Sequence, residues 1–549
     1  MTESLSFRQA LSVLSKSSPY AVSTERDSGI HPDLDLVKKY LLVGTDINDH
    51  FDSLLTSISS ADKKLIFLCG SSGDGKSEIL TQAKKKHNSK ATFYFDATHS
   101  LRPDATAIQT LDELFETFVQ GSQSLVVGIN TGMLGNYANE GKVDSIKASI
   151  NGFLSDKIST ENHIFVDFEH FPKFQLNTDG HTSDFVLKVF KKITASEDNL
   201  IRQYYDIERA LDNPNKRLCA NYRLLAMPSV QLIIVDLLFK ARLERDQFLT
   251  ARALLDFIYH LLVGGEYLFE NLFSGSDCDL IKKMADFDPV NMRNKAIDNF
   301  VLTHRFKGEK SEFDIFSKEL RDFGINVKST TSAQTYIRIF YLLKDEPFGN
   351  NYHKQFSHDF NDDILNEYSK CWRLHWSYSE SHKKDIKEFY NQVLLKGLLT
   401  YNNRSAAGLG NREFLVRHLN GYNLVAELDI KYNPAAIKQQ SCIHETNNHF
   451  DDVSHFYAHI KVNGKDVNPI RININLLSLL NRIVKGYRPN KHDKNTILLL
   501  DEIINELRTL ANAENTLYIH HIDKEDRKDK KYRVEDVDCD GSELEVSGG

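Results

Sequence analysis

Residues 70–77 combine glycines, a lysine and a serine at the spacing of a phosphate-binding loop. They fit the pattern G-x-x-x-x-G-K-S/T, the Walker A motif. Glycines let the backbone curve so that its N–H groups point inward at an anion. Lys76 would then reach the β- and γ-phosphates of a nucleoside triphosphate, and the Ser77 hydroxyl would ligate Mg2+. The pattern predicts binding of ATP and Mg2+ by the loop residues Gly70, Ser71, Ser72, Gly73, Asp74, Gly75, Lys76 and Ser77.

The segments around this loop predict the elements that position it. Five apolar residues, Leu65 to Cys69, indicate a strand buried on both faces of a parallel sheet. A helix should begin at about Lys76, so that its positive dipole end faces the phosphates. Apolar runs at 91–96, 124–130 and 163–167 then alternate with helical patterns at 106–119 and 144–154. Strands alternating with helices predict an α/β fold, a parallel sheet with helices on both faces.

Polar side chains at three strand ends are candidates for the hydrolytic chemistry. Hydrolysis needs a carboxylate that holds Mg2+ and a polar group that orients the attacking water. Asp167 is favoured as the metal-side acid, because Ile164-Phe-Val-Asp167 looks most like a Walker B strand, and Glu169 follows it as a further carboxylate. Asp96 is another candidate metal ligand. Strand order leaves a competing assignment open, in which Asn130 takes the place of the usual Asp and Asp167 that of a sensor residue.

Residues 200–265 are almost continuously helical in pattern. Thr250 is a natural N-cap, and Gly264 a natural stop, for a helix that carries Arg252 in its first turn. By analogy with the lid of AAA+ proteins, where an Arg early in a lid helix touches the γ-phosphate, Arg252 is a sensor candidate. Further cations that could act in cis, or on a second copy of the chain in a homo-oligomer, are Arg202, Arg217 and Arg223.

The length of 549 residues predicts several domains. We expect a P-loop nucleotide-binding domain of AAA+-like type with an N-terminal helical extension (1–195), a helical lid-like domain (196–270), a helical region (271–400) and a C-terminal α+β module (401–549). In the last, Asn463-Gly464 is a hairpin signal, and 517–522 with 532–537 predict a second hairpin around the charged loop 523–530. The stretch 496–510 predicts an amphipathic helix, although residues 497–502 also fit Walker B.

The C-terminal module carries three weaker signals. Asp429 and Lys431 form a D-x-K tripeptide like the tail of a metal-nuclease signature, but no upstream Pro-Asp partner is visible, so a nuclease site is disfavoured. The segment 485–494 interleaves an aromatic residue with cations and is the most DNA-like of the basic clusters, although a solvated face explains such a run. A cluster of histidines comprises His444, His449, His455 and His459. Solvated or core positions explain these residues better than a metal site does.

Composition limits the compartment and the partners. The formal net charge is −8, so the chain as a whole is not strongly attracted to DNA. Its six cysteines are scattered without a C-x-x-C pair, which favours reduced thiols. The N-terminus lacks the pattern of a signal peptide, and no run approaches the roughly 20 apolar residues of a membrane span. These features predict a cytoplasmic protein with no membrane partner.

Three segments of the chain closely resemble the DptF (DndF) family, bacterial proteins of DNA phosphorothioation-dependent restriction systems. They are the loop region 66–80, the run 96–100 (Asp-Ala-Thr-His-Ser) and the run 128–136 (Gly-Ile-Asn-Thr-Gly-Met-Leu-Gly-Asn). The likeness covers essentially the whole chain and is most specific in the nucleotide domain. It implies an ATPase component that acts with the partner proteins DptG and DptH to restrict DNA lacking the sulfur modification of its backbone.

These observations give one expected function and two alternatives. The chain is expected to be an ATPase that powers or gates DNA restriction, with DNA bound directly or through its partners. The irregular Walker B region leaves room for a nucleotide-dependent scaffold with negligible hydrolysis. The least favoured reading makes the chain the nuclease subunit, through Asp429 and Lys431.

Overall fold

The chain folds into two compact units. The computed structural model describes residues 5–18, 32–59, 62–98, 100, 104–156, 159–177, 180–292, 294–306, 311–361, 363–406, 408–410, 412–419, 422–447, 453–512, 516–521, 530–536 and 544–547. The first unit comprises Met1–Gln175 and Thr182–Asn361, and the second Leu176–His181 and Asp362–Gly549. The division after residue 361 falls inside the helical region expected at 271–400, whose last part groups with the C-terminal residues.

The first unit contains a parallel sheet of four strands. Its order is β2 (Ala91–Tyr94), β3 (Ser124–Ile129), β1 (Leu65–Cys69) and β4 (His163–Asp167), and all three neighbouring pairs are parallel. The expectation of a parallel α/β sheet is thereby confirmed, and β1 has the bounds that its five apolar residues predict. Every side chain of β1 is buried, as in a strand covered on both faces.

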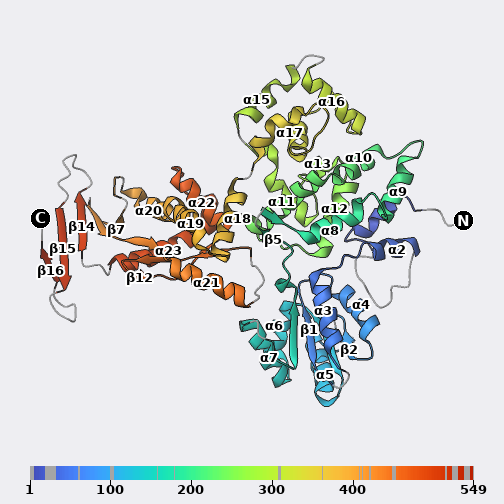
Figure 1. Ribbon diagram of the computed structural model, residues 1–549, viewed down its shortest axis with the longest axis horizontal. Coiled ribbons are helices and arrows are strands. Elements are labelled where there is room, and N and C mark those ends of the chain that lie inside the picture. The colour runs from blue at the N-terminus through green and yellow to red at the C-terminus, as the bar shows by residue number, and fades with distance from the viewer. Residues whose placement is uncertain are drawn as a thin grey trace. The chain divides into compact units, whose positions relative to one another are not determined.

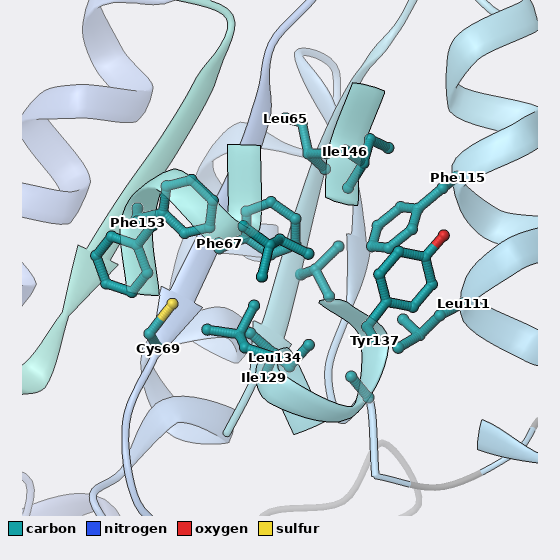
Figure 2. Close-up of a cluster of buried hydrophobic side chains, with 14 of the residues drawn as sticks. Leu65, Phe67, Cys69, Leu111, Phe115, Ile129, Leu134, Tyr137, Ile146 and Phe153 are labelled. Atoms are coloured by element: carbon teal, nitrogen blue, oxygen red, sulfur yellow. The ribbon is translucent and has the colours of Figure 1, made fainter. Parts of the chain in front are cut away.

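Helices cover both faces of this sheet. Alternate residues of each strand point to opposite faces, so each face has its own cluster of apolar side chains. One face, shown in Figure 2, joins Leu65, Phe67 and Cys69 of β1 to apolar residues of α5 (Ala107–Gln120), α6 (Thr131–Glu140) and α7 (Asp144–Asp156). The other joins Ile66 and Leu68 to α3 (Asp46–Ser57) and α4 (Lys76–His87). Each large side chain buried in this way contributes about 1.5–3 kcal/mol of transfer free energy, so the core holds the strand ends in register.

The rest of the first unit is helical (Figure 1). Its helices are α1 (Phe7–Leu11), α2 (Pro32–Tyr40), α8 (Asp184–Thr194), α9 (Leu200–Arg209), α10 (Lys216–Leu225), α11 (Pro228–Arg245), α12 (Ala251–Val263), α13 (Leu268–Asn271), α14 (Asp279–Met284), α15 (Lys295–Thr303), α16 (Glu312–Phe323) and α17 (Ala333–Leu342). The N-terminal helix α1 packs against α9 and α12, and α2 packs against α9. The predicted caps of α12 are confirmed, since Thr250 caps its start and Gly264 ends it.

Helices α10 and α11 meet at a sharp bend. Pro228 occupies the first position of α11, where its missing N–H costs nothing but where it cannot continue the preceding helix. Within the described part of the chain, no single helix has the length and apolar character of a membrane span. The α10–α11 pair would satisfy both criteria together, by length and composition only, with a 77° bend between its members.

The second unit combines helices with antiparallel strands. A five-stranded sheet has the order β16-β15-β14-β8-β7, and smaller sheets have the orders β12-β11-β9 and β10-β13. The strands are β7 (Glu413–Leu419), β8 (Tyr422–Glu427), β9 (Ile430–Tyr432), β10 (Phe456–Ala458), β11 (Ile460–Val462), β12 (Lys465–Asp466), β13 (Ile470–Ile472), β14 (Thr516–His521), β15 (Lys530–Asp536) and β16 (Leu544–Ser547). The helices are α18 (Asp363–Trp376), α19 (Lys383–Glu388), α20 (Lys396–Asn402), α21 (Pro434–Asn447), α22 (Ile474–Val484) and α23 (Lys494–Asn512).

Three local predictions for this unit are confirmed. Asn463 and Gly464 both have positive φ and connect β11 to β12, as a tight hairpin turn requires. Strands β14 and β15 pair antiparallel, as the predicted hairpin requires. Of the loop predicted at 523–530, residues 523–529 lie outside the described residues, and Lys530 already belongs to β15. The Walker B-like run 497–502 lies within α23 and is helical.

A short hairpin, β5 (Gln175–Asn177) and β6 (Gly180–Thr182), stands where the chain passes between the two units.

Candidate functional site

The register of the parallel sheet brings the glycine loop and the residues that follow β2, β3 and β4 together at the carboxyl ends of the strands. Cys69, the last residue of β1, stands opposite Ile129 of β3 and Asp167 of β4. The loop that follows β1 begins at Gly70, whose N–H donates to the Ile129 carbonyl over 3.3 Å. On the other side of β3, the N–H of Ala97 donates to the Gly128 carbonyl over 3.0 Å. Asp96, Asn130 and Asp167 therefore all follow strands that end beside the glycine loop.

Side chains of the glycine loop form hydrogen bonds with the loop's own backbone. The carboxylate of Asp74 accepts a hydrogen bond from the Ser71 N–H at 2.7 Å. Gly75 precedes α4 with a φ of 102°, a left-handed conformation that favours glycine. The Lys76 ammonium donates to the carbonyls of Gly70 and Ser71, both at 2.8 Å. Burial lowers the pKa of Lys76, and the negative charges of Asp74 and Asp96 oppose that shift.

A cavity of about 410 Å3 opens beside this loop within the first unit. Loop residues, the residues after β2 and β3, the first turn of α12 and the N-terminal segment all contribute to its walls. The predicted site residues that line it are Ser72, Gly73, Gly75, Lys76, Ser77, Asp96, Asn130 and Arg252. The structure thus brings together most of the residues that the sequence analysis selected.

Arg252 reaches the cavity because the first turn of α12 lies against the glycine loop. Its backbone N–H donates to the Gly73 carbonyl at 3.1 Å. The hydroxyl of Thr250 accepts from the Ala253 N–H and fixes the start of the helix. The approach is close, since a Cβ at Gly73 would stand 3.1 Å from the Arg252 Cβ. The guanidinium is therefore carried by a helix end that is tied to the loop backbone.

Asp96 and Asn130 present different chemical groups to the same cavity. Asp96 is exposed, and one carboxylate oxygen accepts from the backbone and the hydroxyl of Thr98 at 2.9 and 2.6 Å. Asn130 uses its side-chain oxygen to cap α6, accepting from the Met133 N–H at 2.7 Å. An amide whose oxygen is engaged in this way offers its N–H donors to a ligand. Asp96 can thus supply negative charge, and Asn130 hydrogen-bond donors.

Asp167 and Glu169 lie beside the loop but outside the cavity lining. Asp167 is only 1 % exposed, and its carboxylate accepts from the Glu169 N–H at 3.1 Å. The intervening Phe168 covers Gly70 so closely that a Cβ there would stand 2.8 Å from the phenyl ring. Glu169 is exposed. Of the acids that the structure describes after these strands, Asp96 is the one that faces the cavity.

Two contributions to the site carried no sequence motif. The N-terminal segment supplies an apolar wall through Leu14, Leu41 and Leu42, and the Lys16 N–H donates to Asp256 of α12 at 2.8 Å. Lys173 forms an ion pair with Asp74 at 2.7 Å, which ties the segment after β4 to the loop. Both depend on contacts between residues far apart in sequence, so no local pattern could have indicated them.

The remaining candidate arginines occur outside this cavity lining. Arg202 pairs with Asp206 in the next turn of α9 at 3.1 Å. Arg223 donates to the Phe323 carbonyl at 2.5 Å and stacks on the Phe323 ring. Arg217 is exposed on α10. The first two therefore have structural partners in the helical part of the unit.

The weaker signals in the second unit are dispersed. Asp429 and Lys431 form an ion pair with each other. His455 contacts Ser454 and Arg471, whereas His459 is buried between β10 and β11. His444 lies in α21, and His449 lies outside the described residues. Among the residues that the structure describes, no three His, Cys, Asp or Glu side chains are grouped as a metal site.

Comparisons with protein-family models, with curated proteins and with solved structures found no match to this chain.

Proposed function

We propose that this chain binds ATP with Mg2+ in the 410 Å3 cavity and hydrolyses it as a P-loop NTPase. The observation that carries the proposal is the convergence of Lys76, Ser77, Asp96 and Arg252 on one cavity at the end of a parallel β-strand. Ligands of α/β proteins bind in this place, at the carboxyl ends of the strands. The amino end of α4 adds its partial positive charge to the same point.

The residues present fit a triphosphate in charge and in shape. Lys76 and Arg252 supply two cations, and the loop supplies backbone N–H groups. Leu14, Leu41, Leu42 and Leu255 give the cavity an apolar surface for the nucleoside. To bind the phosphates, the Lys76 ammonium exchanges the carbonyls of Gly70 and Ser71 for phosphate oxygens. Phosphate oxygens carry negative charge, which the carbonyl oxygens lack, so their attraction to the ammonium favours the exchange.

The metal side of the site is formed by Ser77 and Asp96. Bound Mg2+ neutralises phosphate charge, and it is usually held by one or two carboxylates together with phosphates and waters. Asp96 is exposed, lines the cavity and accepts hydrogen bonds from Thr98, so its negative charge lies where it can attract the metal or a water in its shell. The geometry favours Asp96 over the buried Asp167 for this role. Asn130 and Arg252 then act as donors to the phosphates.

Asn130 also supports the second candidate function, a nucleotide-dependent scaffold. It follows β3, the strand directly beside β1, and it offers an amide where a carboxylate would orient water more strongly. The carboxylate of Glu169 does not line the cavity. A site with this composition would hold ATP well and hydrolyse it slowly. Phosphate release, measured with and without DNA and partner proteins, distinguishes the two: turnover supports the ATPase, and its absence supports the scaffold.

The wider role rests on the resemblance to the DptF family. The stretches 66–80, 96–100 and 128–136 that carry it include the glycine loop, Asp96 and Asn130. We propose on this basis that nucleotide binding by the chain serves restriction of DNA that lacks backbone sulfur, together with DptG and DptH.

The decisive experiment replaces the loop lysine. Lys76→Ala should weaken ATP binding in calorimetry by about 1.5–3 kcal/mol, the value of a hydrogen bond to a charged group. Lys85→Ala is the matched control, because Lys85 is exposed on the same helix and does not line the cavity. In cells that carry the partner proteins, Lys76→Ala should also abolish restriction. Equal ATP affinity of the two variants would overturn the proposed site.

A further inference from the structure

We propose that a basic groove on the second unit binds the sugar–phosphate backbone of a nucleic acid. The groove has a volume of about 630 Å3 and lies between the end of α20, the segment 488–491 and the first turns of α23. Its cationic residues are Arg404, Arg488, Lys491 and Lys494, and its single acid is Asp501. The inference is independent of nucleotide binding, because every residue involved belongs to the second unit.

The four cations of this groove outnumber its acid. All four side chains are exposed, and none forms a salt bridge to an acid in the described part of the chain. Asp501 accepts a hydrogen bond from the Tyr401 hydroxyl at 2.8 Å and keeps its negative charge, so the groove retains an excess of three positive charges (four cations less one acid). Four exposed cations around one hollow produce a local positive potential although the whole chain is negative. An anion with several charges is the complementary ligand.

The segment that carries three of these cations has a fixed shape. Asp493 is buried and accepts from Arg482, from the Tyr487 hydroxyl and from the Asn490 N–H, at 2.8, 2.7 and 3.0 Å. On the other wall, Arg404 donates to the Tyr401 carbonyl at 2.8 Å and stacks on the Tyr401 ring. The cations are therefore presented from anchored backbone, which reduces the conformational entropy lost on binding.

The composition of the groove indicates contact with phosphates rather than with bases. Its aromatic residue, Tyr401, is only 4 % exposed, so its ring has no open face on which a base could stack. Two arginine forks and two lysine point charges suit phosphate oxygens. A continuous backbone places several phosphates beside the four cations at once and releases their counterions. The binding should therefore be insensitive to sequence and steeply dependent on salt.

The test measures binding of a fluorescein-labelled DNA duplex of mixed sequence to the full chain, by anisotropy and without nucleotide. The double variant Lys491→Ala/Lys494→Ala should bind about tenfold more weakly at moderate salt, and its slope of log K against log salt should be smaller by about two. Lys384→Ala/Lys438→Ala is the control, because it removes the same charge from exposed positions of the second unit outside the groove. The control should bind DNA as the unchanged chain does.

Three outcomes would overturn the proposal. The first is that the unchanged chain does not bind the duplex, and the second is that both double variants lose affinity equally. The third is that polyglutamate competes as well as unlabelled DNA of equal charge. The last result would make an acidic protein segment the partner. Equal melting temperatures of the two double variants exclude a folding defect as the cause of a difference. Because ATP is absent, a negative result here leaves the nucleotide site untouched, and the reverse also holds.

Discussion

At the scale of single residues, Lys76 and the nearby carboxylates set the charges at the glycine loop and its cavity in the first unit. Lys76 donates to two carbonyls of its own loop, which keeps the ammonium satisfied at a half-buried position. Asp74 joins the loop to Lys173 and Asp96 faces the cavity. Each acid near Lys76 therefore has a different structural position, and substitutions can separate their roles.

The two candidate metal-side acids should respond differently to substitution. Asp96→Asn should remove the contribution of Mg2+ to ATP affinity, reducing the gain on adding Mg2+ by about 1.5–3 kcal/mol, because a carboxylate in the cavity is lost. Asp167→Asn should preserve that gain and lower the melting temperature instead, because its carboxylate is buried. ATP titrations at stepped Mg2+ concentrations measure the first effect and thermal unfolding the second. The assignment fails if Asp167→Asn alone abolishes the Mg2+ dependence.

At the scale of elements, the strand, loop and helix around residues 65–87 depend on close backbone approach as well as on patterning. Gly70 lies under Phe168, the first residue of the short helix after β4. Gly73 lies under Arg252 at the start of α12. The loop is thus enclosed between the end of β4 and the start of α12, and its shape depends on both.

Gly70→Ala should destabilise the first unit by about 1–3 kcal/mol, the usual cost of overpacking. The new methyl would stand 2.8 Å from the Phe168 ring, and Gly70 directly follows the fully buried strand β1. Gly135→Ala in α6 is the control, because nothing lies within 4 Å of that position, and alanine there should stabilise the helix slightly. Urea unfolding measures both changes. Equal stability of Gly70→Ala and the unchanged chain would contradict the contact.

Sequence reasoning succeeded where local pattern decides the structure. The apolar run 65–69, the helix start at Lys76 and the caps of α12 all match the structure, because burial periodicity and cap chemistry act over a few residues. The preference for Asp167 over Asp96 rested on a Walker B resemblance. Which acid reaches the cavity depends on strand order and on Phe168, both of which are set by long-range pairing. The N-terminal wall had no local signal for the same reason.

At the scale of the whole molecule, the division into two units separates the proposed activities. The 410 Å3 cavity proposed to bind nucleotide is built from residues of the first unit alone, and the basic groove from residues of the second. Multi-domain chains commonly unfold in more than one step. A ligand that binds one folded unit stabilises that unit by mass action.

Calorimetric unfolding of the full chain should therefore show two transitions, of which only one moves upward with ATP and Mg2+. At a ligand concentration one hundred times Kd, the added stability is about 2.7 kcal/mol. The Lys76→Ala chain, heated under the same conditions, should show both transitions without the shift. A single transition, or an equal shift of both, would mean that the two units unfold as one.

The chain crosses between the units after residues 175, 181 and 361. A fragment that starts at residue 362 would consequently omit the six residues, 176–181, that group with it. No single truncation yields a whole second unit. Expression of the second unit by itself therefore requires an internal deletion, or a tethered peptide that supplies residues 176–181, rather than a single truncation.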